Sequence, residues 1–432
     1  MQYYSSGRLS QHLLWLASLA GVVGLLAARA FVALSPVVGV LAVLANPDLR
    51  RELPNYYRNG AAMRAAAFVG FLLLSSVYTS EWAIWRHEVF RSLPWLAVPL
   101  AFTLAVPLTG KQRLTVGSLF VLGSGAIGLG TLIKYLLDPV SANAAIGIGQ
   151  NMQAITGVFH VSFGVMLAQS FFWGLILCRH PLAGALLRKA LLAAVCVSIL
   201  TLHILAYRTG LLVLYVGLLG HALWLLSRKS FLLGFGVLLL LAIGPCLAYY
   251  SLESVRERTY ASIWDVQQFM HGSDINKYSL ARRLAAVETA SVVIKDNWLV
   301  GVGPADTHAA MMEQYSWKDF GLLPANRVEV HNQYLYALLG GGLIGLTLWL
   351  AILFWPLTRA QARRNYAICF FILTQATVMM VADMLSLQIG LNLFVFGYGF
   401  LVVTEEAKSR RQLRGAEEPQ KTARRTGTTL RV

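Results

Sequence analysis

Long apolar runs separated by short polar loops recur along most of the chain. Each run has roughly 16 to 27 residues, which lets a helix cross most or all of a hydrocarbon core about 30 Å thick. We therefore predict an all-α, polytopic integral membrane protein with about twelve transmembrane helices. The predicted spans are residues 11–27, 30–46, 62–79, 92–108, 115–137, 152–178, 190–206, 210–226, 231–250, 331–356, 365–382 and 389–404.

One polar segment, residues 251–330, interrupts this pattern between the ninth and tenth predicted spans. It divides the chain into a nine-span bundle at 1–250, the polar segment itself, and three more spans at 331–404. The last residues, 405–432, are rich in Arg, Glu, Gln and Thr, a composition that predicts a disordered, basic tail. Such a tail suits the anionic inner leaflet of a membrane.

The polar segment contains an apolar stripe at helical spacing within residues 279–294. The stripe consists of Leu280, Leu284, Val287 and Ile294. We predict an amphipathic helix that lies on the bundle or in the membrane interface. A turn at Gly301-Val302-Gly303-Pro304 should follow it.

The composition agrees with a membrane environment, since 57% of the residues are hydrophobic, 13% are charged and the mean hydropathy is +0.60. Soluble domains carry about 25% charged residues. The cysteines lie in apolar spans without CxxC spacing, so we interpret them as packing residues. Because neither an HExxH motif nor a DxD pair occurs, we expect chemistry without a metal or other cofactor.

The net charge of +16 suggests nucleic acid as a partner, but the distribution of the charge excludes it. The 251–330 segment holds eight Lys/Arg against ten Asp/Glu, so the positive excess lies in the short loops and the tail. Counting from an inner N-terminus, every second loop is basic, and the positive-inside rule assigns those loops to the cytoplasm. We therefore expect both termini inside and the 251–330 segment outside.

Arg208 lies in a tight reversal, residues 206–210, between two apolar spans at the predicted outer face. An arginine at that depth is costly unless it pairs or faces a polar cavity, which makes it a candidate functional residue. The alternative is an arginine that snorkels and anchors a helix end.

Arg282 and Arg283 are adjacent, so on a helix they point about 100° apart and do not face one ligand equally. A planar guanidinium matches phosphate oxygens in a bidentate manner, which suits one of them to a lipid pyrophosphate. The alternative is a solvated helix face.

His331 opens the tenth predicted span directly after the polar segment. The partial positive charge of a helix N-terminus disfavours imidazolium, so we expect a neutral ring that can accept a proton. The alternative is a helix cap or an interface residue.

Three short motifs occur in an order that resembles the O-antigen ligases, within the O-antigen ligase and polymerase superfamily of bacterial envelope glycosyltransferases. They are Arg-Thr-Gly-Leu at 208–211, Arg-Leu at 283–284 followed by Gly-x-Gly-Pro at 301–304, and His-Asn-x-x-Leu at 331–335. Together with the predicted topology, the resemblance covers most of the chain and implies a GT-C-like fold.

The resemblance also implies the site residues. His331 would be catalytic, and Arg208 and Arg283 would bind the donor pyrophosphate. Arg283 is preferred to its neighbour Arg282 because the family pattern places the arginine directly before leucine. Lower-ranked neighbours of this site are Asn332, Arg91 and His87.

The implied reaction is inverting, metal-independent transfer of a glycan from undecaprenyl pyrophosphate to the lipid A-core oligosaccharide, in lipopolysaccharide biosynthesis. The location would be the bacterial inner membrane, among its lipids, with the active site at the periplasmic face. The arginines would stabilise charge on the leaving pyrophosphate, and the histidine would act as general base.

Three other functions remain open. An O-antigen polymerase uses a similar donor, but no outward arginine here has a glycine eleven residues later, a spacing that such polymerases often carry. A protein O-oligosaccharyltransferase usually adds a large soluble C-terminal domain. A transporter or flippase for lipid-linked sugars typically has inverted repeats, and no such symmetry is found in this sequence.

Overall fold

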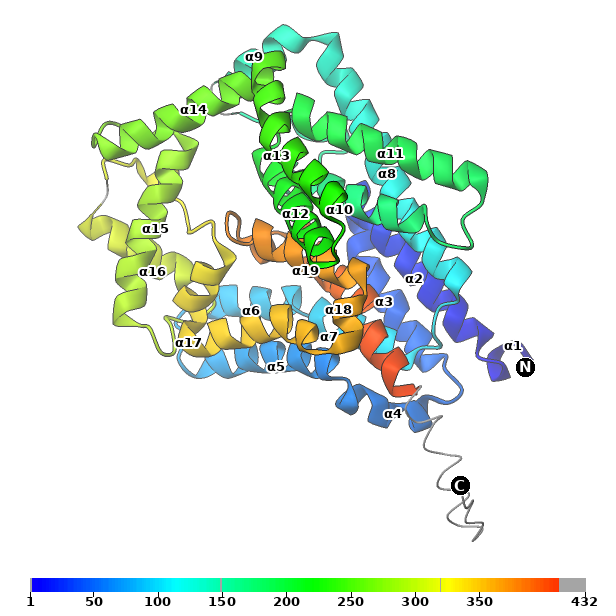
Figure 1. The fold of residues 1–432 in the computed structure, drawn as a ribbon. Coiled ribbons are helices and arrows are strands. Elements are labelled where there is room, and N and C mark those ends of the chain that lie inside the picture. The colour runs from blue at the N-terminus through cyan, green and yellow to red at the C-terminus, as the bar shows by residue number, and fades with distance from the viewer. Residues whose placement is uncertain (1, 148–149, 319, 412–432) are drawn as a thin grey trace.

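The computed structural model describes residues 2–147, 150–318 and 320–411, and the regular structure within these ranges is helical. Figure 1 shows the long helices gathered in a bundle, with a separate group of three helices to one side of it. That group consists of α14 (Glu253–Met270), α15 (Ser279–Asp296) and α16 (Thr307–Trp317). It corresponds to the polar segment of the sequence.

Nine helices in the described ranges are long and apolar enough to cross a membrane. They are α2 (Arg8–Leu26), Gly60–Val77 (α5, Gly60–Leu74, with η1, Ser75–Val77), α8 (Gly110–Leu137), α10 (His160–Leu177), α11 (Ala185–Ile204), α12 (Arg208–Ser227), α13 (Phe231–Ser251), Gln333–Thr358 (α17, Gln333–Phe354, with η3, Trp355–Thr358) and Gln388–Arg411. The other three predicted spans coincide with shorter helices, α3 (Arg29–Leu44), α7 (Pro94–Leu104) and α19 (Tyr366–Val378). The chain is thus a polytopic, helical membrane protein, while the count of about twelve spans stays a prediction.

Local side chains determine where several helices begin. Thr109 and Gln112 form a capping box at the start of α8, in which the Gln112 amide donates to Thr109 Oγ1 at 3.2 Å. Asn59 caps α5 by accepting a hydrogen bond from the Ala62 amide at 3.1 Å. Pro94 occupies the first turn of α7, where its missing N–H leaves no helical hydrogen bond unmade.

The last helix extends further than the sequence predicts. Helix α20 (Gln388–Gly397) continues through the π-helical η5 (Tyr398–Val403) and on to Arg411. Within it Glu406 is buried and accepts hydrogen bonds from Arg64 at 3.0 Å and from the Ala61 amide at 3.1 Å. The prediction of a disordered tail from residue 405 is therefore wrong for residues 405–411, because composition alone does not reveal the ion pair between Glu406 and Arg64. Residues 412–432 lie outside the described residues.

An aromatic core joins the last spans to the earlier ones. Trp95 of α7, Trp349 of α17 and Phe394 of α20 are at most 1% exposed. The Phe394 ring centroid lies 5.4 Å from that of Trp95 and 5.1 Å from that of Trp349. Buried aromatic rings in such tilted contact contribute both apolar area and specific geometry to the packing.

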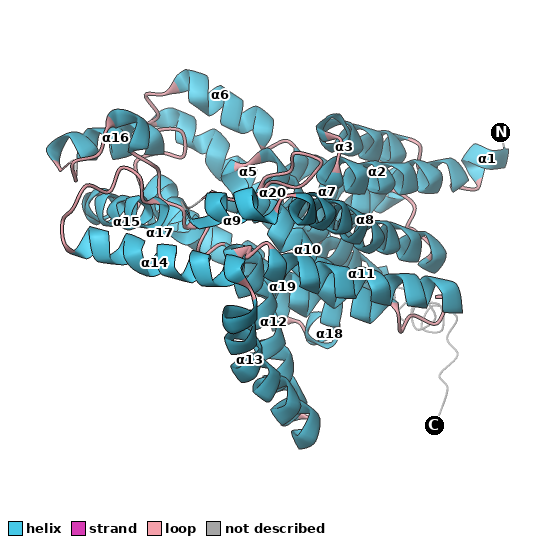
Figure 2. Ribbon diagram, turned by 90° about the horizontal axis from the view of Figure 1, so that it is seen from above, coloured by secondary structure: helices cyan, strands magenta, loops and turns pink. Residues whose placement is uncertain are grey.

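Helix α13 is exposed along most of its length and packs chiefly on α12 and α14. Figure 2 shows α12 and α13 projecting together from the rest of the bundle. In a membrane, lipid tails would cover this apolar surface. Two of the cysteines, Cys196 on α11 and Cys246 on α13, are also exposed, so their interpretation as packing residues is wrong.

The predicted amphipathic helix at 279–294 is confirmed as α15, but its buried face differs from the predicted stripe. The buried residues are chiefly alanines, including Ala281, Ala285 and Ala290, whereas Val287 is 37% exposed. These small side chains lie in one buried cluster with Met311 of α16 and Leu339 of α17, and their size allows the helices to approach closely. A search for large apolar residues overlooks such a face.

The predicted turn at 301–304 is confirmed, and it attaches the polar segment to α17 through the main chain. The amide of Val302 donates to the carbonyl of Leu339 at 3.0 Å, and the amide of Leu343 donates to the carbonyl of Trp298 at 2.8 Å. Helix α17 is kinked at this contact, where Gly342 has φ +56°. A Cβ on Gly301 would lie 2.6 Å from the α17 backbone, so glycine is required at this position.

Candidate functional site

Arg208 is the first residue of α12 and follows an unusual turn. Ala206 has φ +47°, and the hydroxyl of buried Tyr207 donates to the carbonyl of Met152 at 2.7 Å. Gly210 lies so close to Gly164 of α10 that a Cβ would be 2.7 Å from the Gly164 carbonyl oxygen. The Arg208 guanidinium donates from Nη1 to Ser262 Oγ of α14 at 2.8 Å. Arg208 therefore reaches the polar segment and does not simply anchor a helix end.

Arg258 of α14 lies beside Arg208 and was not singled out in the sequence. Its side chain is 3% exposed, and its Nη2 donates to the carbonyl of Gln150 and, at 2.7 Å, to Asn151 Oδ1. Burial, together with the charge of Arg208, lowers the pKa of Arg258 to about 10, against an opposing effect of Asp265. In the sequence Arg258 is one charge among many on a polar helix, so nothing marked it.

Arg282 and Arg283 point to different surroundings, as their helical spacing predicts. Arg283 donates from Nη1 to the carbonyl of Val381 at 3.4 Å, whereas Arg282 donates to Asn326 Oδ1 at 3.1 Å within the polar segment. Burial and then the charge of Arg208 lower the pKa of Arg283 below its ordinary value, while Asp383 raises it. Arg283 is thus the member of the pair that is electrostatically coupled to Arg208 and Asp383.

The charges of Arg208, Arg258 and Arg283 all act on the ring of His160, the first residue of α10. Four basic side chains from α10, α12, α14 and α15 therefore gather in one region. Like charges brought together in this way repel one another, and an anion between them would relieve the repulsion. The arrangement is suited to binding a polyanionic group such as a diphosphate.

His331 lies two residues before the first residue of α17, so the prediction that it opens the span is wrong by two residues. Asn332 is the N-cap and the helix begins at Gln333. The His331 Nδ1 lies 2.7 Å from Asp383 Oδ1, and the two side chains are 33% and 18% exposed.

Asp383 lies in the turn between α19 and η4 (Met384–Ser386), 52 residues after His331. By accepting from Nδ1–H it would fix the tautomer in which Nε2 is the free, proton-accepting nitrogen. No hydrogen bond to Nε2 occurs within the described part of the chain. The pair therefore has the form of a carboxylate-oriented base, and sequence reasoning missed the aspartate.

The lower-ranked residues have distinct surroundings. Asn332 Oδ1 accepts from the amides of Tyr334 at 2.9 Å and Leu335 at 3.1 Å, so its role is that of a helix cap. His87 is 74% exposed on α6 (Trp82–Arg91), and within the described residues its one polar contact is with Glu88, at 3.7 Å. The structure does not bring His87 to the arginine cluster.

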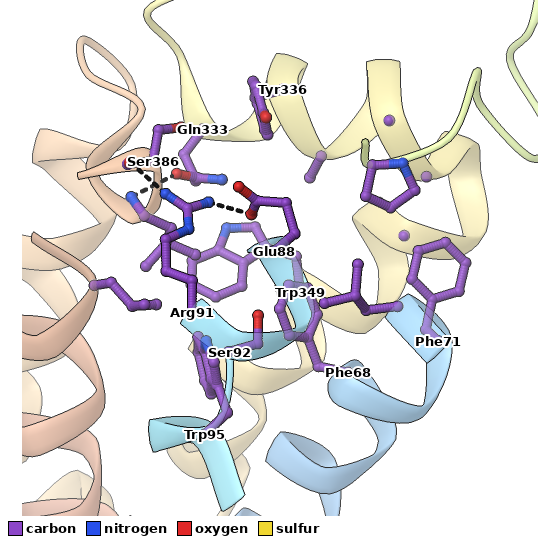
Figure 3. A pocket seen from close by; sticks show the side chains of 18 residues that line it. Phe68, Phe71, Glu88, Arg91, Ser92, Trp95, Gln333, Tyr336, Trp349 and Ser386 are labelled. Carbon is purple, nitrogen blue, oxygen red and sulfur yellow. Dashed lines mark hydrogen bonds and ion pairs between the residues drawn. The ribbon is translucent and has the colours of Figure 1, made fainter. Parts of the chain in front are cut away.

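Arg91 of α6 is paired with Glu88 and donates to the carbonyl of Ser386. Figure 3 shows this ion pair at the rim of a small cavity, close to Gln333 and Tyr336 and above Trp95. The cavity has a volume of about 80 Å³, too small for a sugar. Because Ser386 follows Asp383 by three residues, Arg91 supports the turn that carries the aspartate.

A larger cavity lies between α14 and the start of α12. It has a volume of about 710 Å³, and its lining includes Arg208, Arg258, Asp265, Trp264, Tyr278 and Lys277. Cationic, hydrogen-bonding and aromatic groups therefore face the same space. Across the described ranges, no group of three or more His, Cys, Asp or Glu side chains is placed to hold a metal ion.

Comparison with known protein families gives a match over residues 192–350, to the family model described as O-antigen ligase. The matched region includes Arg208, Arg258, Arg283 and His331, whereas Asp383 lies beyond it. A search of curated proteins finds no match to the chain.

Proposed function

Because the chain belongs to the O-antigen ligase family, we propose that it is a ligase that transfers a glycan from undecaprenyl pyrophosphate to the lipid A-core oligosaccharide. Family membership itself supports the coarser function, an O-antigen ligase or polymerase type of activity in envelope glycan assembly. The donor, the acceptor and the residue roles are parts of the proposal.

The observation that supports the proposal most is the placement of His331. Its Nδ1 lies 2.7 Å from Asp383, and the charge of that aspartate acts on Arg283, which is in turn coupled to Arg208. The residue proposed as base and the two arginines proposed to bind phosphate are thus linked, although they lie in three separate segments of the chain. Glycosyl transfer from a lipid diphosphate needs both kinds of group.

In the proposed reaction, a hydroxyl oxygen of the acceptor attacks the anomeric carbon of the donor glycan. Nε2 of His331 takes the hydroxyl proton as the new glycosidic bond forms. The bond between the anomeric carbon and the phosphate oxygen breaks on the opposite face, and its electron pair leaves with undecaprenyl pyrophosphate. Arg208 and Arg283 stabilise the negative charge that develops there. Attack opposite the leaving group inverts the anomeric carbon.

The proposed setting is the bacterial inner membrane, with both termini in the cytoplasm and the site at the periplasmic face. The alternating basic loops support this orientation. Lipid-linked donor and lipid A-core acceptor would then both be reached from the outer leaflet.

The test is reconstitution of purified protein with undecaprenyl-pyrophosphate glycan and rough lipopolysaccharide. We expect the glycan on the lipid A-core. Growth of the glycan on the undecaprenyl carrier alone would identify a polymerase. Movement of the lipid-linked glycan across the vesicle membrane without any new glycosidic bond would identify a transporter.

A further inference from the structure

Arg258 carries unmet hydrogen-bonding capacity inside the protein. It is 3% exposed, yet its Nε and Nη1 have no hydrogen-bond partner among the residues that the structure describes. The two acceptors that it does have, at Gln150 and Asn151, are both neutral. Among the described residues no carboxylate forms an ion pair with it. Buried guanidinium N–H groups nearly always find acceptors, because an unpaired buried cation is strongly unfavourable.

Arg258 is also one of the residues that line a cavity. Arg258 and Arg208 line the same cavity of about 710 Å³, whose lining also includes the carboxylate residues Glu257 and Asp265. Arg208 has Ser262 as a hydrogen-bond partner, which is neutral as well. Within the described ranges, neither of these two neighbouring guanidinium groups has a carboxylate in hydrogen-bond contact, an arrangement that favours an anionic ligand between them.

We propose that Arg258 is a third arginine that binds the donor diphosphate. In this proposal the diphosphate occupies the cavity lined by Arg208 and Arg258 and extends towards Arg283. This inference rests on the proposed function, from which it takes the diphosphate lipid. A diphosphate presents two phosphoryl groups, and a single arginine satisfies the oxygens of one group at a time. Three guanidinium groups therefore distinguish a diphosphate from a monophosphate, which is the lipid carrier's other common form.

The other role that the geometry allows for Arg258 is purely structural, as a support for the main chain at Gln150 and Asn151. The two roles predict different effects of Arg258 on phosphate binding. A ligand contact affects affinity for phosphate directly, whereas a support acts through residues 150–151. Removing the Asn151 acceptor while leaving Arg258 in place separates them.

The test measures binding of undecaprenyl diphosphate and undecaprenyl monophosphate to the full-length protein in nanodiscs of neutral lipid. We expect Arg258→Met to weaken binding of the diphosphate at least about tenfold, since a charge-assisted hydrogen bond is lost. Binding of the monophosphate should weaken much less. Arg256→Met is the matched control, because it removes the same charge from the opposite side of α14 and should leave both affinities unchanged.

Asn151→Ala should leave the diphosphate affinity within about threefold of wild type, less than a charged hydrogen bond contributes. An equal loss in Asn151→Ala and Arg258→Met would overturn the inference, and so would an unchanged diphosphate affinity in Arg258→Met. If Arg258→Met does not insert as a folded protein, Arg258→Lys serves instead. It retains the charge but not the planar group, and a preference for diphosphate equal to that of wild type would overturn the inference.

The outcomes also separate this inference from the proposed function. Selective loss of diphosphate binding in Arg258→Met, in a protein that transfers nothing to the lipid A-core, would support the inference and refute the ligase. Failure of the wild-type protein to bind the diphosphate lipid would overturn both.

Discussion

At the scale of single residues, the His331 pair carries the sharpest prediction. His331→Ala should lower single-turnover transfer by about a hundredfold to ten-thousandfold, the usual contribution of a general base. Affinity for the lipid-linked donor should stay nearly unchanged, because the proposal assigns donor binding to the arginines. Both quantities should be measured on the same nanodisc preparation.

Asp383→Asn should give a smaller loss in the same chemical step, since the ring stays in place but loses its orienting carboxylate. Weakened donor binding with an unchanged chemical step in His331→Ala would make this histidine a donor-binding residue.

The arginines provide a second prediction, which concerns shape as well as charge. Arg208→Lys and Arg283→Lys should both lose most transfer, because an ammonium group does not reproduce the planar fork that matches phosphate. Arg282→Ala is the control, since Arg282 donates to Asn326 within the polar segment. An inactive Arg282→Ala beside a normal Arg283→Ala would show that the wrong member of the pair was chosen.

The contrast between these residues indicates what a sequence can reveal about a site. Arg208, Arg283 and His331 each lie in a short motif, so local pattern was enough to propose them. Asp383 meets His331 from 52 residues away, and Arg258 meets Asn151 from 107 residues away. Such pairs depend on how the helices pack, which spacing along the chain does not encode.

At the scale of elements, Asp306 joins the start of α16 to the loop that follows α5. Its carboxylate accepts from Thr79 Oγ1 and Ser80 Oγ, both at 2.6 Å, and from the Ser80 amide at 2.9 Å. Burial by itself raises the pKa of Asp306, but these hydrogen bonds outweigh it and hold the pKa below its ordinary value. The charged carboxylate therefore ties the polar segment to the bundle.

A pH dependence follows from that lowered pKa. The stabilisation is fully present above the unfolded-state pKa of about 3.9 and is lost as the pH falls through the folded-state value. Asp306→Asn should lower stability at neutral pH by about 1 to 3 kcal/mol and flatten the dependence at acid pH. Thermal unfolding in detergent between pH 7 and pH 3 measures both effects. Glu313→Gln, an exposed change on α16, is the control, and an identical profile for the two variants would contradict the assignment.

The positions of the helices could largely be predicted from the hydrophobic pattern, but the side of each helix that is buried could not. Every predicted span coincides with a helix, because a membrane leaves the backbone few alternatives. The buried face of α15 was predicted wrongly because it consists mainly of alanines, whose small side chains allow close helix packing. The end of the last helix was predicted wrongly because Glu406, although charged, is buried by its ion pair with Arg64. Both errors come from the assumption that buried positions are occupied by large hydrophobic side chains.

At the scale of the whole molecule, orientation in the membrane is the main prediction. A cysteine at Trp317, which is 81% exposed in the polar segment, should react with an impermeant reagent in intact spheroplasts. A cysteine at Arg228, in a predicted inner loop, should react only after permeabilisation. Both variants need a background without the four native cysteines. Labelling of position 228 from outside would invert the proposed topology and move the site to the cytoplasmic face.

The contact between Glu406 and α5 also has a consequence for synthesis on the ribosome. Arg64 and the side chain of Asn59 are translated 342 and 344 residues before Glu406 and the Val403 carbonyl, which pair with them at 3.0 Å. The contact between α5 and the helix that contains Glu406 therefore forms only after this much later segment has been translated. A message truncated before codon 406 yields a protein with an uncompensated cation at that contact.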